Sequence, residues 1–310
     1  MQSRAALIIP VYNGGAIFAD CLAAITAQTV TFGRKIVVDS SSTDGSADLA
    51  RAAGFEVVTI AKAAFDHGGT RNFALNMVTE DFVVFLTQDA ILATTDAVAR
   101  LLQVFDDTSV AGAYGRQLPH LNADPLAKFT RARNYGKASY VTARSDAMPQ
   151  GLGKCFLSNS FSAYRRADLV AIGGFPEKLI MGKDSFAAAK FLMAGKKVAY
   201  NADATAHHSH NYTVQQEFAR CFDIGVFHND QIWMLNEFGG VQGQGVRFAL
   251  DQIRAMYSAR HYRLMAVSFA ASAAKFIGYR LGRRCKLLGR ALSARLAMHK
   301  GYFAAPIVRK

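Results

Sequence analysis

Short apolar runs alternate with longer, partly polar stretches through about the first ninety residues of the chain. Four apolar runs predict strands: Ala5–Val11, Lys35–Asp39, Phe55–Ile60 and Asp81–Leu86. The intervening segments begin at turn or cap residues and predict helices: Ala16–Gln28, Ser46–Ala53 and Gly69–Val78. Strands that alternate with helices in this way favour an α/β fold, with a mostly parallel sheet flanked by helices on both faces.

The later segments predict a helix over Ser185–Ala194 and a strand over Lys197–Tyr200, which is followed by an expected loop over Asn201–Ala206. Near the C-terminus, apolar residues recur at steps of three and four, which predicts one helix with an apolar stripe: Leu281, Cys285, Leu288, Leu292 and Leu296. Basic residues flank this stripe. The helix therefore either packs the stripe on the protein body or lies in a membrane interface, and periodicity alone favours neither.

The charge of the chain is concentrated at this end. There are 36 basic and 23 acidic residues, for a net charge of +13, and residues 252–310 contain 13 of the basic residues and no acidic one. A neutral body with a basic C-terminal region indicates an anionic membrane surface as partner. Nucleic acid is not expected, because the aromatic residues of this region are not interleaved with the basic ones as base-stacking platforms would be.

Composition excludes several other classes of protein. Hydrophobic residues make up 51% of the chain, which is too many for a disordered protein. The four cysteines are widely spaced, which predicts neither a zinc site nor a disulfide framework and favours a reducing compartment. The apolar run near the N-terminus is too short for a signal peptide, and Leu264–Ala274 is too short to span a bilayer. We therefore expect a cytoplasmic protein, peripheral on the inner face of the cytoplasmic membrane.

Three polar side chains follow predicted strands: Asn13, Asp39 and Asp89. Ligands of open α/β sheets bind outside the carboxyl ends of the strands, so these side chains predict a site at that edge. The first turn reads Val-Tyr-Asn-Gly-Gly, which lacks the glycine pattern of a dinucleotide fold, and no phosphate-binding P-loop occurs. The site is therefore of another kind.

Five motifs resemble glycosyltransferase family 2 enzymes with a GT-A fold: Ile9–Asn13, Val37–Ser46, Thr87–Ala90, Gly173–Glu177 and Lys183-Asp184. Three further segments are similar to bacterial rhamnosyltransferases that use dTDP-L-rhamnose: Phe65–Asn72, Leu86–Ala90 and His208–Tyr212. With a C-terminal similarity over Gly278–Arg283 and Leu296–Lys300, the resemblance covers nearly the whole chain.

The resemblance implies a set of donor-binding residues: Pro10, Val11, Tyr12, Asn13, Asp39, Ser41, His67, Gly68, Arg71, Gln88, Asp89 and Arg116. Asp39 would accept the N3–H of a pyrimidine, and the alternative for this residue is a turn cap. His67, Gly68 and Arg71 stand in a glycine loop that opens a helix, where backbone N–H groups can face a diphosphate. Arg116 would hold a phosphate or a hydroxyl, or lie in solvent.

The resemblance also implies a metal site and a base. Asp89 occupies the position of the last carboxylate of the family's metal-binding motif, and His208 would complete the shell of a Mg²⁺ or Mn²⁺ ion, although His207 and His210 lie close in sequence. Asp184 would act as general base, and the alternative is a helix N-terminal carboxylate. Lys183 replaces the family's usual glutamate, and its ammonium group would favour ionised Asp184 but weaken it as a base.

The sequence therefore predicts an inverting glycosyltransferase that moves L-rhamnose from dTDP-L-rhamnose to a polyprenyl-diphosphate-linked O-antigen or capsule intermediate. One alternative is a family 2 enzyme that uses another nucleotide sugar, such as a UDP-hexose. A second alternative is a catalytically weak subunit that only binds the sugar nucleotide. The expected organisation is a GT-A catalytic domain over residues 1–214 and a helical, basic region over residues 215–310 that contacts the membrane interface or the acceptor.

Overall fold

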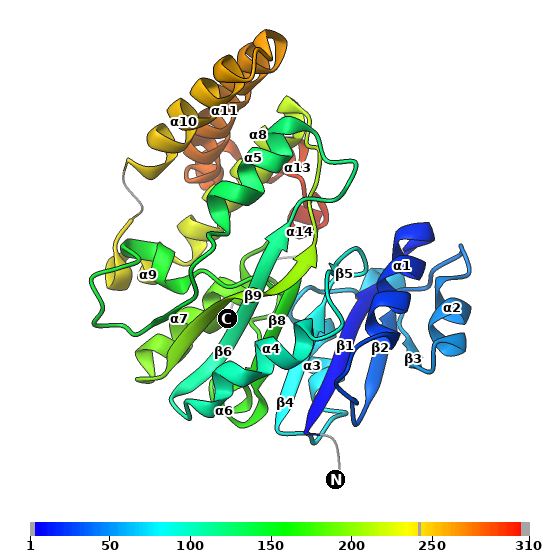
Figure 1. Ribbon diagram of the computed structural model, residues 1–310. Coiled ribbons are helices and arrows are strands. Elements are labelled where there is room, and N and C mark those ends of the chain that lie inside the picture. Colours follow the sequence, from blue (N-terminus) through cyan, green and yellow to red (C-terminus); the bar gives the residue numbers. More distant parts are fainter. Residues whose placement is uncertain (1–3, 241–242, 305–310) are drawn as a thin grey trace.

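The computed structural model describes residues 4–240 and 243–304, and in that part of the chain nine strands form one sheet with helices on both faces (Figure 1). Its first half is parallel, in the order β3-β2-β1-β4. These strands are β1 (Ala5–Val11), β2 (Lys35–Asp39), β3 (Glu56–Thr59) and β4 (Phe82–Leu86). Helices α1 (Gly15–Thr26), α2 (Ser46–Ala52) and α3 (Gly69–Leu75) connect them, which confirms the predicted alternation.

The second half of the sheet is mixed. Strand β8 (Phe161–Arg165) pairs antiparallel with both β4 and β6 (Val110–Leu118), and β6 runs parallel to β9 (Lys197–His207). Two short strands, β5 (Ile91–Leu92) and β7 (Tyr140–Thr142), pair with β9. The helices of this half are α4 (Ala97–Gln103), α5 (Pro125–Asn134), α6 (Arg166–Ala171) and α7 (Lys183–Met193), with short 3₁₀ turns at Lys62–Ala64, Val104–Asp106 and Gly151–Cys155.

The loop expected over Asn201–Ala206 is instead part of β9, which continues to His207. Ala202, Ala204 and Ala206 are buried, whereas the residues between them are more exposed. This alternation is the period of a strand with one covered face. The longer strand carries the chain directly to the histidines that follow it.

The described part of the chain after residue 213 is mainly helical. It comprises α8 (Val214–Asp230), α9 (Ile232–Phe238), α10 (Gln244–Ser258), α11 (Tyr262–Gly282), α12 (Cys285–Leu288), α13 (Arg290–Leu296) and α14 (Gly301–Ala304). Phe222, Met234 and Ala297 belong to the same buried cluster as residues of the sheet, so this region shares the core of the catalytic body. The α10–α11 pair extends away from the sheet (Figure 1), and no helix in residues 4–240 and 243–304 combines the length and hydropathy of a bilayer span.

The single helix predicted over Leu281–Leu296 is wrong, because the chain breaks into α11, α12 and α13. Gly289 separates the last two helices. Its φ of +72° is a backbone conformation that residues other than glycine rarely adopt. Cys285 is buried, and Leu281, Leu288 and Leu296 pack against the core. Only Leu292 of the stripe is exposed, so this stripe packs on the protein body and is not free to enter a membrane.

Helices α8 and α11 cross at very short range. A Cβ built on Gly282 would lie 2.0 Å from the backbone oxygen of Phe222, and one on Gly278 would lie 2.4 Å from that of Phe218. Gly225 of α8 faces α11 in the same way. The contact therefore requires glycine at all three positions, since backbone atoms cannot yield as a side chain can.

Substitution Gly282→Ala is expected to reduce the free energy of unfolding by about 1–3 kcal/mol, because the added methyl group forces the two helices apart. Gly245→Ala, in α10, is the matched control, because nothing lies within 4 Å of its Cβ position, and a small gain in stability of up to about 1 kcal/mol is expected there. Urea unfolding followed by circular dichroism measures both. Equal stabilities of the two variants would contradict close packing at Gly282.

Candidate active site

A cleft of about 2900 Å³ opens at the carboxyl ends of β1 and β4 and extends under the C-terminal helices. Most predicted site residues line it: Pro10, Val11, Tyr12, Asn13, His67, Arg71, Gln88, Asp89, Asp184 and His208. Four do not: Asp39, Ser41, Gly68 and Arg116. The predicted edge of the sheet therefore carries a cleft, and the four other side chains lie outside its lining for local reasons.

Tyr12 and Gln88 join the ends of β1 and β4 at one rim of the cleft. The Tyr12 N–H donates to Gln88 Oε1 at 2.8 Å, and Gln88 Nε2 donates to the Tyr12 carbonyl at 3.2 Å. The Lys62 ammonium donates to the Tyr12 hydroxyl at 2.6 Å and lies 4.3 Å from the centre of its ring. This rim therefore presents an ordered aromatic face beside the strand ends.

The turn after β2 holds two of the predicted site residues, Asp39 and Ser41. The Asp39 carboxylate accepts the Ser42 N–H at 3.1 Å and is 2% exposed, which is the turn-capping role that the sequence left as the alternative. Ser41 has φ +60° and donates its hydroxyl to the Ile60 carbonyl, away from the cleft. The preceding residue, Ser40, lines the cleft in its place.

The glycine loop before α3 is closed by a carboxylate of its own. Asp66 Oδ1 accepts the N–H groups of Gly68 at 2.9 Å and Gly69 at 2.7 Å. The expectation that these N–H groups face a diphosphate is therefore wrong, because Asp66 already occupies them. His67 and Arg71 do reach the cleft, and Arg71 Nη1 donates to the His67 carbonyl at 2.8 Å.

The same loop is clamped to the segment before α7. Asn72 donates Nδ2–H to the Phe175 carbonyl and accepts the Phe175 N–H, both at 2.8 Å. Asp66 Oδ2 accepts the Lys178 N–H at 3.1 Å, and a Cβ on Gly68 would lie 2.0 Å from the Pro176 carbonyl oxygen. Two motifs about a hundred residues apart thus form one rigid unit.

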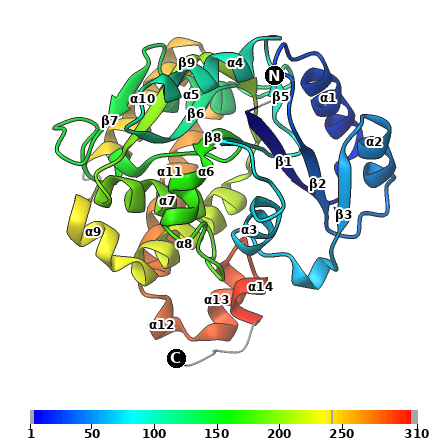
Figure 2. The same cartoon turned by 90° about the horizontal axis from the view of Figure 1, so that it is seen from below.

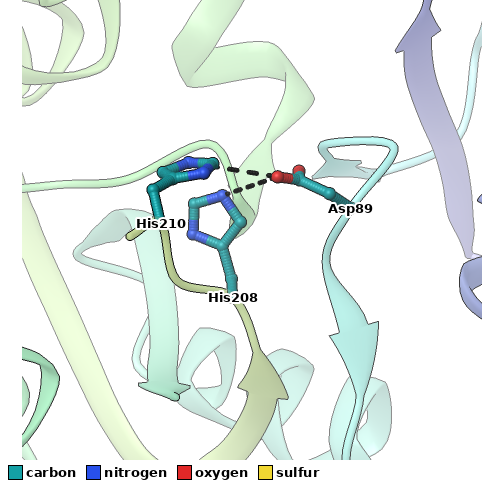
Figure 3. A group of neighbouring side chains, drawn as sticks. All are labelled: Asp89, His208 and His210. Atoms are coloured by element: carbon teal, nitrogen blue, oxygen red, sulfur yellow. Dashed lines mark ion pairs between the residues drawn. The ribbon is translucent and has the colours of Figure 1, made fainter. Parts of the chain in front are cut away.

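Asp89, His208 and His210 converge on one point (Figure 3). Asp89 Oδ2 lies 3.5 Å from His208 Nε2 and 3.9 Å from His210 Nε2, and one ligand atom from each residue lies within 4.8 Å of the others. Burial raises the pKa of the Asp89 carboxyl, but hydrogen bonding to His208 and the charge of that ring outweigh burial and lower this pKa below its ordinary value. Burial and the neighbouring His208 lower the pKa of His210 to about 4, so its imidazole is neutral at pH 7.

Gln117 orients His208, and the sequence did not indicate it. Gln117 Oε1 accepts from Arg131 Nη1 at 2.7 Å, which fixes the amide because arginine only donates. The same oxygen accepts from His208 Nδ1–H at 3.0 Å, so His208 Nε2 is the ring atom turned toward Asp89. Arg116 was the residue of this strand expected to bind the donor. Consecutive strand residues point to opposite faces, and Gln117 is the one that reaches the cleft.

The three residues suit a divalent metal ion. An anionic carboxylate and two imidazoles, one with its lone pair oriented by a hydrogen bond, are ligands for a first-row divalent ion. His207 is excluded from this group, because its Nδ1 contacts the Pro119 carbonyl at 2.8 Å. His210 joins the predicted pair Asp89 and His208, so both the second and the third histidine of the motif contribute.

Asp184 lies in the first turn of α7 and faces the cleft. Its Oδ2 accepts the Asn159 N–H at 3.1 Å, and its Oδ1 accepts the Ser185 N–H at 3.0 Å. The next residue after Asn159, Ser160, has its hydroxyl oxygen 3.5 Å from His208 Nε2. The fixed Asp184 carboxylate is therefore bonded to the residue next to Ser160, and Ser160 contacts His208.

An α/β sheet with a metal-ligand group and a fixed carboxylate at its carboxyl edge is the architecture of glycosyltransferases with a GT-A fold. The sequence model of the family described as Glycosyl transferase family 2 matches residues 6–173. The chain is 42% identical over 302 residues to O-antigen chain rhamnosyltransferases WbaN of Salmonella anatum and RfbN of Salmonella typhimurium, covering 96% of this chain and 95% of each relative. The chain belongs to glycosyltransferase family 2 and is a glycosyltransferase.

Solved structures agree in fold. The mannosyltransferase PcManGT from Pyrobaculum calidifontis, in complex with GDP-Man and Mn²⁺, superposes with a TM-score of 0.59 at 18% identity, covering 98% of this chain and 86% of that one. TarS 1-349 of S. aureus superposes with a TM-score of 0.54 at 17% identity, covering 92% of both chains. At these identities the likeness shows a common fold.

Substitution Gln117→Ala is expected to weaken the binding of Mn²⁺ about 10- to 100-fold, because His208 loses the acceptor that orients its ring. Titration of the metal-free protein with Mn²⁺, followed by electron paramagnetic resonance, measures the affinity. His207→Ala is the control that should bind Mn²⁺ as the wild type does. Unchanged affinity of Gln117→Ala would contradict a metal site at His208.

Proposed function

We propose that the protein is an inverting rhamnosyltransferase that transfers L-rhamnose from dTDP-L-rhamnose to a polyprenyl-diphosphate-linked O-antigen or capsule intermediate. The observation that carries the proposal is the placement of Asp184 in one cleft with Asp89, His208 and His210. The names of the two 42% identical relatives support the choice of sugar and of an O-antigen acceptor. Their coverage of nearly the full chain supports a function for the whole protein.

The donor nucleotide is assigned to the rim at β1 and β2. Pro10 to Asn13 line this part of the cleft, and the Tyr12 ring, which has Lys62 near it, offers a flat surface for a pyrimidine. Asp39, at the end of β2, is proposed to accept the N3–H of the base. Its bond to Ser42 N uses part of the acceptor capacity of a carboxylate, which has about four lone-pair sites.

Asp89, His208 and His210 are assigned to a resident divalent metal. Imidazole ligands favour Mn²⁺ over Mg²⁺, which prefers oxygen ligands and water. When bound, the ion supplies positive charge beside the leaving diphosphate.

Asp184 is assigned as the general base. Its two backbone hydrogen bonds hold the carboxylate in one orientation in the cleft, as a positioned base requires. Inversion by direct displacement needs the acceptor oxygen to attack the anomeric carbon while its proton passes to a carboxylate. The bond to the diphosphate oxygen breaks as the new glycosidic bond forms, and dTDP leaves.

Purified protein is expected to release dTDP from dTDP-L-rhamnose in the presence of a polyprenyl-diphosphate-linked glycan and Mn²⁺, with much lower turnover of UDP-glucose and UDP-galactose. Asp184→Asn is expected to lower kcat about 100- to 10,000-fold, because it removes the base, and to leave Mn²⁺ affinity unchanged. Higher turnover of a UDP-hexose would overturn the assigned sugar. Full activity of Asp184→Asn would overturn the assigned base.

We further propose that the α10–α11 pair contacts an anionic membrane. Tyr262, Phe269 and Phe276 recur at steps of seven on α11, so they share one face of the helix, and each is more than half exposed, with Phe269 at 70%. Arg260 and Arg263 lie at the turn between the two helices. Exposed aromatic residues beside basic ones suit an interface with anionic lipid. This face differs from the Leu281–Leu296 stripe, which is packed on the body.

Flotation with vesicles containing phosphatidylglycerol tests this membrane contact. The wild type is expected to float with these vesicles and not with neutral ones, and the triple variant Tyr262→Ser, Phe269→Ser, Phe276→Ser is expected to stay in the soluble fraction. The double variant Leu49→Ser, Phe73→Ser removes exposed apolar residues elsewhere and serves as control. Flotation of the triple variant at the wild-type level would contradict the assignment.

A further inference from the structure

The segment after α13 carries a histidine into the active-site cleft. The buried carboxylate of Asp223 on α8 accepts the Met298 N–H at 3.3 Å, the His299 N–H at 2.9 Å and His299 Nδ1–H at 2.7 Å. Tyr302 donates its hydroxyl to Asp230 of the same helix at 2.8 Å. His299 is therefore fixed by its backbone and by one ring nitrogen, which leaves Nε2 for the cleft that the residue lines.

His299 meets the glycine loop at the floor of the cleft. Its ring lies edge-on to the ring of His67, with centroids 5.3 Å apart and planes at 82°. Figure 2 shows the C-terminal helices α13 and α14 beside α3, the helix that begins at this loop. Among the described residues, the ring nitrogens of His67 and Nε2 of His299 have no hydrogen-bond partner within the protein. The two rings thus present polar atoms that no other described residue satisfies.

Lys183 and Arg71 add positive charge at the same place. Lys183 is the first residue of α7, after Gly182 at φ +77°, and its ammonium group makes no hydrogen bond or ion pair in the described part of the chain. Arg71 is 3% exposed, lines the cleft, and has an Nε–H without a partner. Buried cations of proteins are normally paired, so the buried Arg71, beside the partly buried Lys183, departs from the usual arrangement.

The nearest carboxylates do not satisfy these cations. Asp66 accepts three backbone N–H groups, and Asp184 accepts two. Burial, followed by the charge of Arg71, lowers the pKa of Lys183 to about 8, although Asp184 and Asp66 oppose that shift. Burial, then Lys183, Arg71 and His299 lower the pKa of His67 to about 2. The cluster therefore holds desolvated positive charge beside the neutral imidazole of His67.

We propose that Lys183, His299 and His67, with Arg71 behind them, form a phosphate-binding subsite beside Asp184, distinct from the metal ligands. The inference rests on the proposed function for the identity of the ligand, which is a phosphate group of one of the two substrates. The Lys183 ammonium provides a charge-assisted donor of the kind that binds phosphate oxygens. His299 Nε2 contributes a further donor when its ring is protonated, because Asp223 holds Nδ1–H.

The position of the subsite favours the diphosphate of the acceptor lipid. The donor diphosphate is assigned to Asp89, His208 and His210, whereas Arg280, Arg283 and Arg284 extend the lining of the cleft on the C-terminal side. Phe269 and Phe276 line the same side of the cleft and are exposed. A lipid chain along this aromatic face would place its diphosphate near Lys183 and His299, next to the base that must reach the acceptor hydroxyl.

Calorimetric titration with inorganic pyrophosphate tests the subsite without requiring activity. The full chain is titrated in EDTA, in buffer free of phosphate and sulfate, so that the metal ligands do not contribute. Lys183→Met is expected to weaken pyrophosphate binding about tenfold or more, and His299→Ala several-fold, since each removes a charged or polar partner. Lys190→Met, which removes the same charge from the same helix outside the cleft, is expected to bind pyrophosphate as the wild type does.

Steady-state kinetics then identify the substrate. A higher KM for the lipid-linked acceptor with an unchanged KM for dTDP-L-rhamnose in His299→Ala supports the acceptor diphosphate, and the reverse pattern assigns the subsite to the donor. Lys183→Arg, which keeps the charge, is expected to retain pyrophosphate binding and covers the case in which Lys183→Met does not fold. Wild-type protein that binds no pyrophosphate, or variants that bind it as tightly as the wild type, would overturn the subsite whether or not the enzyme proves to transfer rhamnose.

Discussion

The side-chain amide of Asn72 joins the two halves of the active site. It binds both the N–H and the carbonyl of Phe175, so the loop before α3 and the segment before α7 move as one unit. Asp66 reinforces the unit by accepting N–H groups from both segments. Because α7 begins a few residues later, this clamp determines where Lys183 and Asp184 stand relative to His67 and Arg71. The motifs around Asn72 and Phe175 therefore have a structural role, which is to hold these two segments together.

Local patterns were sufficient to predict the parallel half of the sheet and the edge on which the site lies, because buried strands are visible as apolar runs. Single-residue predictions failed where side-chain direction decides: Ser41 and Arg116 each neighbour the residue that reaches the cleft, Ser40 and Gln117. The prediction for Gly68 failed because Asp66 accepts its N–H, and the glycine pattern does not reveal this hydrogen bond within the turn. His299 could not be predicted, since only the folding of the last segment against Asp223 brings it to the cleft.

The basic C-terminal region has two parts with different physical roles. Its apolar stripe is used for packing, because Cys285 is buried in the core shared with the sheet, and Leu281, Leu288 and Leu296 pack against that core. Its charges divide between the exposed α10–α11 pair and the cleft, where Arg283 and His299 lie. The three glycines at the crossing of α8 and α11 connect these parts, since they fix the direction in which α11 leaves the body. The basic residues behind the net charge of +13 thus lie in the cleft as well as on the surface.

In the proposed mechanism Lys183 stands next to the base Asp184, and an ammonium group beside a base opposes proton uptake. The Asp184 carboxylate is held by two backbone N–H groups and does not bind Lys183 directly. With a phosphate on Lys183, the charge of the ammonium group is offset at the moment the acceptor is in place. The carboxylate then receives the hydroxyl proton against less opposing charge than in the empty cleft. A lysine at this position would in this way couple the binding of an anionic substrate to the strength of the adjacent base.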